Sequence, residues 1–478
     1  MKTKPPYVKT SFVWLTLIAL LSCKTPRLTY GELPIQLPNR FNSFNTDSIE
    51  HFKLERNFFF NDSQLIELID TALLHNQELN IVLHEIAISQ SEVLEKQGEY
   101  LPFVDFGINM GTEKSARYTR NGAVEHTLEI DNGRSFPEPL PDFKWGASAS
   151  WEVDVWHKLR DAKNASELQL LAQNQAKNFL ITQLVAEIAT TYYEWMALQS
   201  LIEILNQNVE VQSSALEKMR IMKNYGKVNQ LVVNRFEAQL LNTQNQQFAI
   251  NQKKTETENK LHVLIGKYPE GINWKPLPLV NVQLKNIHAG LPKQLLQNRP
   301  DIKQAEFELK STKLNVQAAK ASFYPKLNLQ TGVGFQAFDP KFLIQPESLI
   351  YNLAGDLTAP LINRKAIHAQ FNRATAKQIQ SAYSYAQTVL MAYTEVLKQL
   401  SKLNNCTNSL KTKFQEVELL KQSVEIAHFL FQNAKADYVE VLLTQEEVLD
   451  AQMELIEIKL QEIHANIQLY KALGGGWQ

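Results

Sequence analysis

The feature that most constrains the fold of this 478-residue chain is a very long stretch without helix breakers that follows a strand-like segment. Residues 145–156 alternate apolar and polar side chains in large part, which is typical of a β-strand. From there to Gly226 the chain holds neither proline nor glycine, and apolar residues recur at the three- and four-residue steps of a helix. At 1.5 Å per residue such a helix would be roughly 100 Å long, which argues against a compact enzyme.

The same plan occurs twice along the chain, which is the strongest sign of its organisation. Each half reads helix, proline, strand, loop, strand, very long helix, turn and long helix. Pro102 and Pro325 end the first helix of each half, and the same alignment pairs Asn76 with Arg299. The segments that carry the pattern are strand-like residues 103–110, a polar loop expected over 113–144, strand-like residues 326–338 and 349–361, and a second Pro- and Gly-free tract over 364–431.

The N-terminus reads as an export signal that ends in a lipoprotein box. Three lysines precede the apolar run of residues 12–21, and Ser22 and Cys23 follow it, as in a secretory leader. We therefore expect lipidation at Cys23, with ordinary signal cleavage nearby as the alternative. If Cys23 carries lipid, only Cys406 remains, so an intrachain disulfide is not possible.

These patterns predict five segments. They are a lipoprotein signal peptide at residues 1–22, an extended N-terminal arm at 23–61, a first structural repeat at 62–266, a connector at 267–292 and a second structural repeat at 293–478.

The composition gives no electrostatic argument for nucleic-acid binding, because 49 basic and 50 acidic residues leave a net charge of −1. The ten histidines lack metal-ligand spacing, and the sequence has no nucleotide-type glycine loop. We interpret Glu152 and Asp154 as pore-facing or hydrogen-bonding groups at a strand–helix junction, and Arg299 with Asp301 as a structural pair at a helix start. The sequence therefore predicts no enzyme, no catalytic residues, no cofactor and no metal.

Four alternating strands cannot close a barrel alone, and an open sheet would leave two edges unpaired in a membrane. The strands have the length that crosses a bilayer with tilt, so we expect copies of the chain to close the sheet together. Mostly polar helices with narrow apolar stripes suit side-by-side packing around a polar channel. The alternative is a lipid-anchored periplasmic coiled coil, structural or adhesive, that forms no pore.

Six motifs, in order along residues 65–477, resemble those of the outer-membrane efflux factor (TolC-like) family, in particular its lipoprotein subgroup that serves RND-type pumps. The motifs are Ala72 and Leu73 with Asn76 and Leu79; residues 150–156 (SWEVDVW) with Leu159 and Arg160; Leu291 and Pro292 with residues 299–306 (RPDIKQAE); residues 323–327 (FYPKL); residues 357–361 (LTAPL); and residues 469–477 (LYKALGGGW).

The resemblance implies a mainly α-helical fold with a membrane β-barrel. Three protomers would each give four strands to one twelve-stranded barrel in the outer membrane, and their helical hairpins would form an α-barrel in the periplasm. The homotrimer would work with a periplasmic adaptor protein and an inner-membrane pump as a passive exit duct for efflux. Outer-membrane lipid would surround the strands and Cys23 would anchor the chain, whereas the exported substrate is not readable from the sequence.

The resemblance also implies a gate at the periplasmic ends of the helical hairpins. The first tip corresponds to Tyr225 and Gly226, and the second lies within residues 433–440. Asp437 and Glu440 are the candidates for an acidic constriction, since three copies would form a ring of like charges. The alternative is that both are solvated acids that the helix dipole favours at a helix start.

Overall fold

The computed structural model describes residues 37–38, 41, 56–131, 133–269, 278–285, 290, 292–360, 362, 364–433 and 435–477. The predicted signal peptide and Cys23 therefore lie outside the described residues. Two compact units make up the chain, and each takes segments from both sequence repeats. Unit 1 takes the described residues that fall within Ala87–Leu171 and Phe307–Tyr383, whereas unit 2 takes those within Pro34–Ile86, Ala172–Glu306 and Ser384–Gln478.

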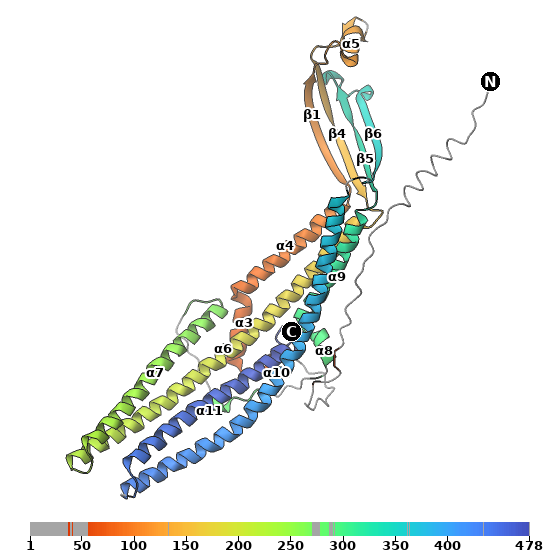
Figure 1. Ribbon diagram of the computed structural model, residues 1–478. Helices are drawn as coiled ribbons and strands as arrows, with labels where there is room; N and C mark the ends of the chain where they lie inside the picture. Colours follow the sequence, from red (N-terminus) through yellow and green to blue (C-terminus); the bar gives the residue numbers. More distant parts are fainter. Residues whose placement is uncertain are drawn as a thin grey trace. The chain divides into compact units, whose positions relative to one another are not determined.

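Unit 1 contains a four-stranded antiparallel sheet with the order β1-β4-β5-β6 (Figure 1). Its strands are β1 (Phe103–Glu113), β4 (Leu140–Val153), β5 (Lys326–Ala337) and β6 (Leu349–Thr358). The register pairs Ile108 with Trp145, Trp145 with Phe335, and Phe335 with Leu349. The central contact between β4 and β5 therefore joins the two sequence repeats.

The segment expected as one polar loop over residues 113–144 is more ordered than predicted. It holds the short helix α5 (Arg120–Thr127) and the small strands β2 (Glu129–Asp131) and β3 (Arg134–Ser135), and β4 begins already at Leu140. Pro141 of β4 has a register partner in β1, Thr112, but none in β5, because pairing with β5 starts only at Phe143. At this point β4 is an edge on its β5 side, where a residue without a backbone N–H is tolerated.

Unit 2 contains two antiparallel helical hairpins (Figure 1). One joins α6 (Lys158–Asn224) to α7 (Gln230–Leu264), and the other joins α10 (Lys365–Gln432) to α11 (Tyr438–Ala472). The helices α6 and α10 contain 67 and 68 residues, and the first part of each belongs to unit 1. Apolar side chains at helical spacing form the main core of unit 2, including Ile188, Tyr192, Leu205, Ile467 and Tyr470.

Short elements cover this core. They are α2 (Arg56–Phe60), α3 (Ser63–His75), η1 (Leu279–Asn281), α8 (Pro292–Asn298) and the start of α9 (Pro300–Ala321). The helix α4 (Gln77–Tyr100) follows α3. Of the predicted N-terminal arm, residues 56–60 form α2, and Phe59 stacks on Tyr470 with ring centroids 4.4 Å apart. Phe41 is also buried and stacks on Tyr393.

In each repeat, a side chain near its start donates a hydrogen bond to the end of its last helix, at equivalent positions within unit 2. The Asn76 amide donates to the carbonyl of Leu264 at the end of α7, and the Arg299 guanidinium donates to the carbonyl of Ala472 at the end of α11. The glycines that follow these helix ends, Gly266 and Gly474, have positive φ and press against backbone carbonyls. A Cβ on Gly474 would lie 2.5 Å from the carbonyl oxygen of Asn298, so only glycine fits there.

Candidate channel wall and helical tips

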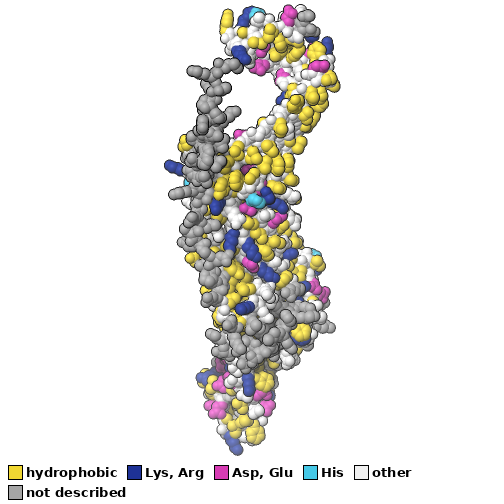
Figure 2. All heavy atoms as spheres, turned by 90° about the vertical axis from the view of Figure 1, so that its right-hand side faces the viewer, with side chains coloured by type: hydrophobic (Ala, Val, Ile, Leu, Met, Phe, Trp, Pro, Cys, Tyr) yellow, Lys and Arg dark blue, Asp and Glu magenta, His cyan; other side chains and the backbone are white. Residues whose placement is uncertain are grey.

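The sheet of unit 1 has one apolar face and one polar face, because side chains alternate along each strand. The register places these residues on the apolar face: Val104, Phe106, Ile108, Met110, Phe143, Trp145, Ala147, Ala149, Trp151, Leu327, Leu329, Val333, Phe335, Leu349, Tyr351, Leu353 and Leu357. Many of them are largely exposed, such as Met110 at 75% and Leu353 at 81%. Figure 2 shows hydrophobic side chains crowded over the strands, with charged side chains more frequent on the loops and helices. An apolar sheet face of this kind fits contact with lipid.

The polar face carries small and hydrophilic side chains and is hollowed. It presents Asp105, Gly107, Asn109, Lys144, Gly146, Ser148, Ser150, Gln330, Gly332, Gly334, Gln336 and Asn352 around a groove of about 500 Å³. Gly146 and Gly334 are register partners on β4 and β5. A Cβ on Gly334 would lie 2.4 Å from the carbonyl oxygen of Trp145. Glycines therefore allow the close backbone approach of a sheet that curves around its polar face.

Within the described residues, β1 and β6 each form an edge of this sheet. The strands contain 11, 14, 12 and 10 residues, the length that spans a bilayer when tilted by roughly 45°. An open edge is not stable in hydrocarbon, since each unpaired backbone group there costs several kcal/mol. The sheet is therefore complete only when both edges meet further strands.

The junction between β4 and α6 is fixed by the two acids noted in the sequence. Glu152 pairs with Lys158, with the carboxylate oxygen and Nζ 2.9 Å apart. The buried Asp154 carboxylate accepts hydrogen bonds from the backbone N–H groups of Leu159 and Arg160. Their interpretation as hydrogen-bonding groups is confirmed, because Asp154 satisfies the free donors of the first helical turn.

An aromatic pair lies at the same junction between β4 and α6. Trp156 stacks on Tyr324 with ring centroids 4.8 Å apart, and its indole N–H donates to the carbonyl of Pro325. The side chain of Trp156 remains 46% exposed. Tryptophan and tyrosine are enriched where a membrane protein meets the lipid headgroups, so this pair fits the periplasmic boundary of the bilayer.

The tip of the α6–α7 hairpin is a tight glycine turn. Gly226 has φ +69, and the N–H groups of Gly226 and Lys227 donate to the carbonyls of Lys223 and Met222. These bonds end α6 in the usual C-terminal manner. Tyr225 is 78% exposed, so its ring is available to another chain.

The tip of the α10–α11 hairpin carries the two predicted gate acids. Asp437 precedes α11, and its carboxylate accepts from the N–H of Tyr438 at 2.7 Å. Glu440 lies in the first turn of α11, and both acids are exposed. Both acids therefore lie at the start of α11, as the alternative of solvated helix-start acids describes. Their exposure is also compatible with a ring of acids from several copies of the chain.

The two tips belong to the same unit and pack together. Phe431, Tyr438 and Leu442 from the second hairpin lie against the apolar cluster that Met219 and Phe236 help to form. A pocket of about 470 Å³ lies between the hairpins, lined by side chains from all four helices.

Sequence reasoning did not single out a polar pair in this pocket, His428 and Gln445. The Gln445 amide bonds the His428 imidazole at 3.0 Å. Burial and the nearby Lys218 ammonium lower the pKa of His428. Only the pairing of α10 with α11 brings these two residues together.

Among the residues that the structure describes, no group of three or more His, Cys, Asp or Glu side chains is arranged to hold a metal ion. Of the helices that the structure describes, none has the length and apolar character needed to cross a membrane.

The two-faced sheet and the helical hairpins define the class of this protein as a membrane channel whose strands continue into very long helices. The chain belongs to the outer membrane efflux protein family, whose model matches residues 68–267 and 291–475. This match confirms the resemblance seen in the six sequence motifs, and it makes the chain an outer-membrane channel component of an efflux system.

Individual relatives agree over most of the chain. The sequence is 27% identical to the pyoverdine export outer membrane protein OpmQ of Pseudomonas putida over 462 residues, which cover 96% of each chain. It is 26% identical to the toluene efflux pump outer membrane protein TtgI of P. putida over 88% of this chain and 87% of the relative. The cation efflux system protein CusC of Escherichia coli is 24% identical, over 88% of each chain.

Solved structures confirm the predicted fold. CusC superposes with a TM-score of 0.82 at 20% identity, over 95% of this chain and 100% of that chain. The open state of the MtrE outer membrane channel of Neisseria gonorrhoeae gives a TM-score of 0.83 at 20% identity, over 95% of this chain and 98% of that chain. The fold is thus mainly α-helical, with the helical hairpins of an α-barrel and the strands of a membrane β-barrel.

Proposed function

We propose that three copies of this chain form a passive exit duct in the outer membrane, supplied by an inner-membrane pump through a periplasmic adaptor. The observation that carries this proposal is the open sheet of unit 1, with bilayer-length strands, one lipid-compatible face and two edges that need partners. Three copies of four strands would give a twelve-stranded barrel. The pump would supply the energy, because a wide pore conducts but does not drive transport.

The adaptor would dock at the hairpin tips, where Tyr225 and other side chains are exposed. The names of the relatives cover solvents, pyoverdine and cations, so relationship alone does not define the solute that this chain exports.

Conductance in a planar lipid bilayer tests the duct. We expect the purified protein to migrate as a trimer and to give discrete current steps after insertion. The alternative that the sequence left open, a lipid-anchored coiled coil that is structural or adhesive, would bind the membrane without conducting, and the family match does not support it. A trimer that inserts but stays silent, even when Asp437 and Glu440 are neutralised, would refute the duct.

We propose further that Asp437 and Glu440 narrow the closed duct in a ring of three copies, where bound cations offset the repulsion between the carboxylates and hold the ring together. Asp437→Asn with Glu440→Gln removes the charge but keeps a good helix cap, because asparagine caps as well as aspartate. We expect larger or more frequent openings from this variant. Glu446→Gln with Glu447→Gln, two exposed acids on the same helix, is the matched control and should conduct like the wild type. Equal conductance of all three proteins would exclude an acidic gate.

We also propose that Cys23 is lipidated and anchors the protein to the outer membrane, with the helices in the periplasm. Labelled palmitate should enter the wild-type protein and not a Cys23→Ala variant. Equal labelling of both proteins would contradict this assignment.

A further inference from the structure

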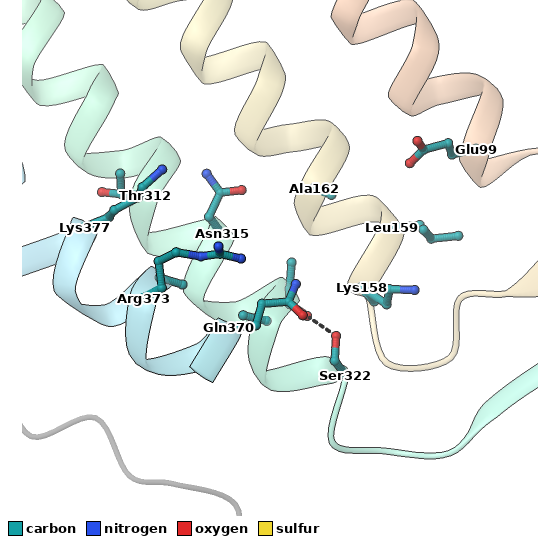
Figure 3. A pocket seen from close by; sticks show the side chains of 13 residues that line it. Glu99, Lys158, Leu159, Ala162, Thr312, Asn315, Ser322, Gln370, Arg373 and Lys377 are labelled. Atoms are coloured by element: carbon teal, nitrogen blue, oxygen red, sulfur yellow. Dashed lines mark hydrogen bonds between the residues drawn. The ribbon is translucent and has the colours of Figure 1, made fainter. Parts of the chain in front are cut away.

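Unit 1 contains a polar pocket of about 450 Å³ that no sequence motif marked. The helices α4, α6, α9 and α10 all contribute to its lining. Figure 3 shows Arg373 and Lys377 on α10 on one side, and Thr312 and Asn315 on the neighbouring α9. Lys158 on α6 lies beyond them.

The charges of the pocket are unbalanced. Lys158 is neutralised by Glu152 at 2.9 Å, and the lining acid Glu99 is bonded to Lys96 at 2.8 Å. Among the described residues, Arg373 and Lys377 take part in no ion pair, although they lie one helical turn apart. Two like charges at this spacing repel each other slightly, so the pocket favours an anion that lies between them.

A neutral donor completes the site. The Asn315 amide lines the same pocket, and Figure 3 shows the Arg373 side chain reaching toward Asn315. The Thr312 hydroxyl also lines the pocket but donates to the carbonyl of Leu309 at 2.9 Å. A guanidinium presents parallel N–H groups that match the two oxygens of a carboxylate. We propose that this pocket binds the carboxylate group of an organic anion in transit, which makes carboxylate-bearing solutes a substrate class of the channel.

The position of the pocket supports this assignment, which rests on the proposed exit duct. The register puts Glu152 on the polar face of the sheet, and its ion pair with Lys158 links that face to the pocket. Asp105 and Asp356 carry negative charge on the same face. These acids limit the cationic region to the pocket. An anion bound there is therefore held locally and can leave again, as conduction requires.

Block of the trimer by citrate tests the inference. In 0.1 M KCl we expect citrate added to the periplasmic side to interrupt the current, whereas neutral glycerol does not. Arg373→Gln with Lys377→Gln should raise the half-blocking citrate concentration at least about tenfold, since charge-assisted hydrogen bonds are lost. Lys365→Gln, which removes a cation of the same helix outside the pocket lining, should leave the block unchanged.

The exchange variant Arg373→Lys with Lys377→Arg keeps both charges and should retain citrate block. The block should also weaken in 1 M KCl, where the screening length falls to about 3 Å. A channel that conducts but is blocked equally in the wild type and the glutamine variant would overturn the carboxylate site and leave the duct intact. Absence of any conductance would instead contradict the duct.

A glutamine variant that no longer forms trimers would indicate that these cations contact an acid of the neighbouring copy. The single variant Lys377→Gln and the exchange variant then decide. Citrate block of Lys377→Gln that equals the block of the wild type would refute the site, and so would loss of block in the exchange variant, which keeps both charges.

Discussion

We expect a large contribution to stability from Arg299, which the sequence marked as half of a helix-start pair and as the repeat counterpart of Asn76. Its side chain is 7% exposed, and its guanidinium donates to Asp301 at 2.7 and 3.0 Å, to Glu395 at 2.8 Å, and to the carbonyl of Ala472 at 2.9 Å. Burial disfavours the charged form, but the bonds to Asp301 and Glu395 outweigh it and raise the pKa of Arg299. One side chain thus joins α9, α10 and the end of α11.

Arg299→Ala would leave Asp301 and Glu395 as carboxylates without their cation and would free the Ala472 carbonyl. Removing one partner of a buried ion pair costs about 3–5 kcal/mol. The Glu395 side chain is 29% exposed and Asp301 15% exposed, so water can compensate part of the loss. We therefore expect the free energy of unfolding to fall by about 3 kcal/mol, the lower end of that range.

Urea unfolding in detergent, followed by far-UV circular dichroism at one fixed protein concentration, measures this change. Concentration must be held constant because assembly contributes to apparent stability. Lys293→Ala, which removes an exposed cation of the neighbouring α8, is the control and should change stability by about 0.5 kcal/mol or less. A double-mutant cycle of Arg299→Ala with Glu395→Ala should give a coupling energy of roughly 1 kcal/mol or more.

A difference of less than about 1 kcal/mol between the free energies of unfolding of Arg299→Ala and Lys293→Ala would refute this role of Arg299. A coupling energy near zero would show that Glu395 does not depend on Arg299. Arg299→Lys adds a further check, because lysine keeps the charge but cannot reproduce the fork of bonds to Asp301. It should therefore lie between the wild type and the alanine variant.

Two further predictions test the face of the sheet and the pH response. Val333→Arg places a charge on the apolar face of β5 and should destabilise the inserted trimer by about 2–4 kcal/mol. Gln330→Arg on the polar face should be tolerated and change only conductance, so equal trimer yields of the two variants would contradict the assigned faces. Burial lowers the pKa of His464 in the folded protein, against a smaller opposite effect of its bond to Thr190. As pH falls below about 6.5, the imidazole is therefore protonated in the unfolded chain before it is protonated in the folded chain, and stability should decline. Melting curves from pH 8 to 5 should show a smaller decline for His464→Gln, and an unchanged slope would rule out this histidine as a cause.

The sequence by itself determined the secondary structure and its repetition. Two tracts without proline or glycine predicted α6 and α10 to within one or two residues at each end, because nothing in them interrupts the helical hydrogen bonds. Alternation predicted the four long strands, since the period of two separates lipid-facing from polar side chains in any register. The ordered elements between Glu113 and Leu140 were missed, because short helices and strands carry too few residues to show a period.

Only the tertiary structure decided which distant residues meet. The contacts of Asn76 with Leu264 and of Arg299 with Ala472 join segments far apart in the chain, and no local pattern specifies such partners. The same holds for the pocket of Arg373 and Lys377, which exists because α9 and α10 lie side by side. Periodicity is a property of neighbouring residues and can be read from the sequence, whereas a charge without a partner is a property of the packed helices.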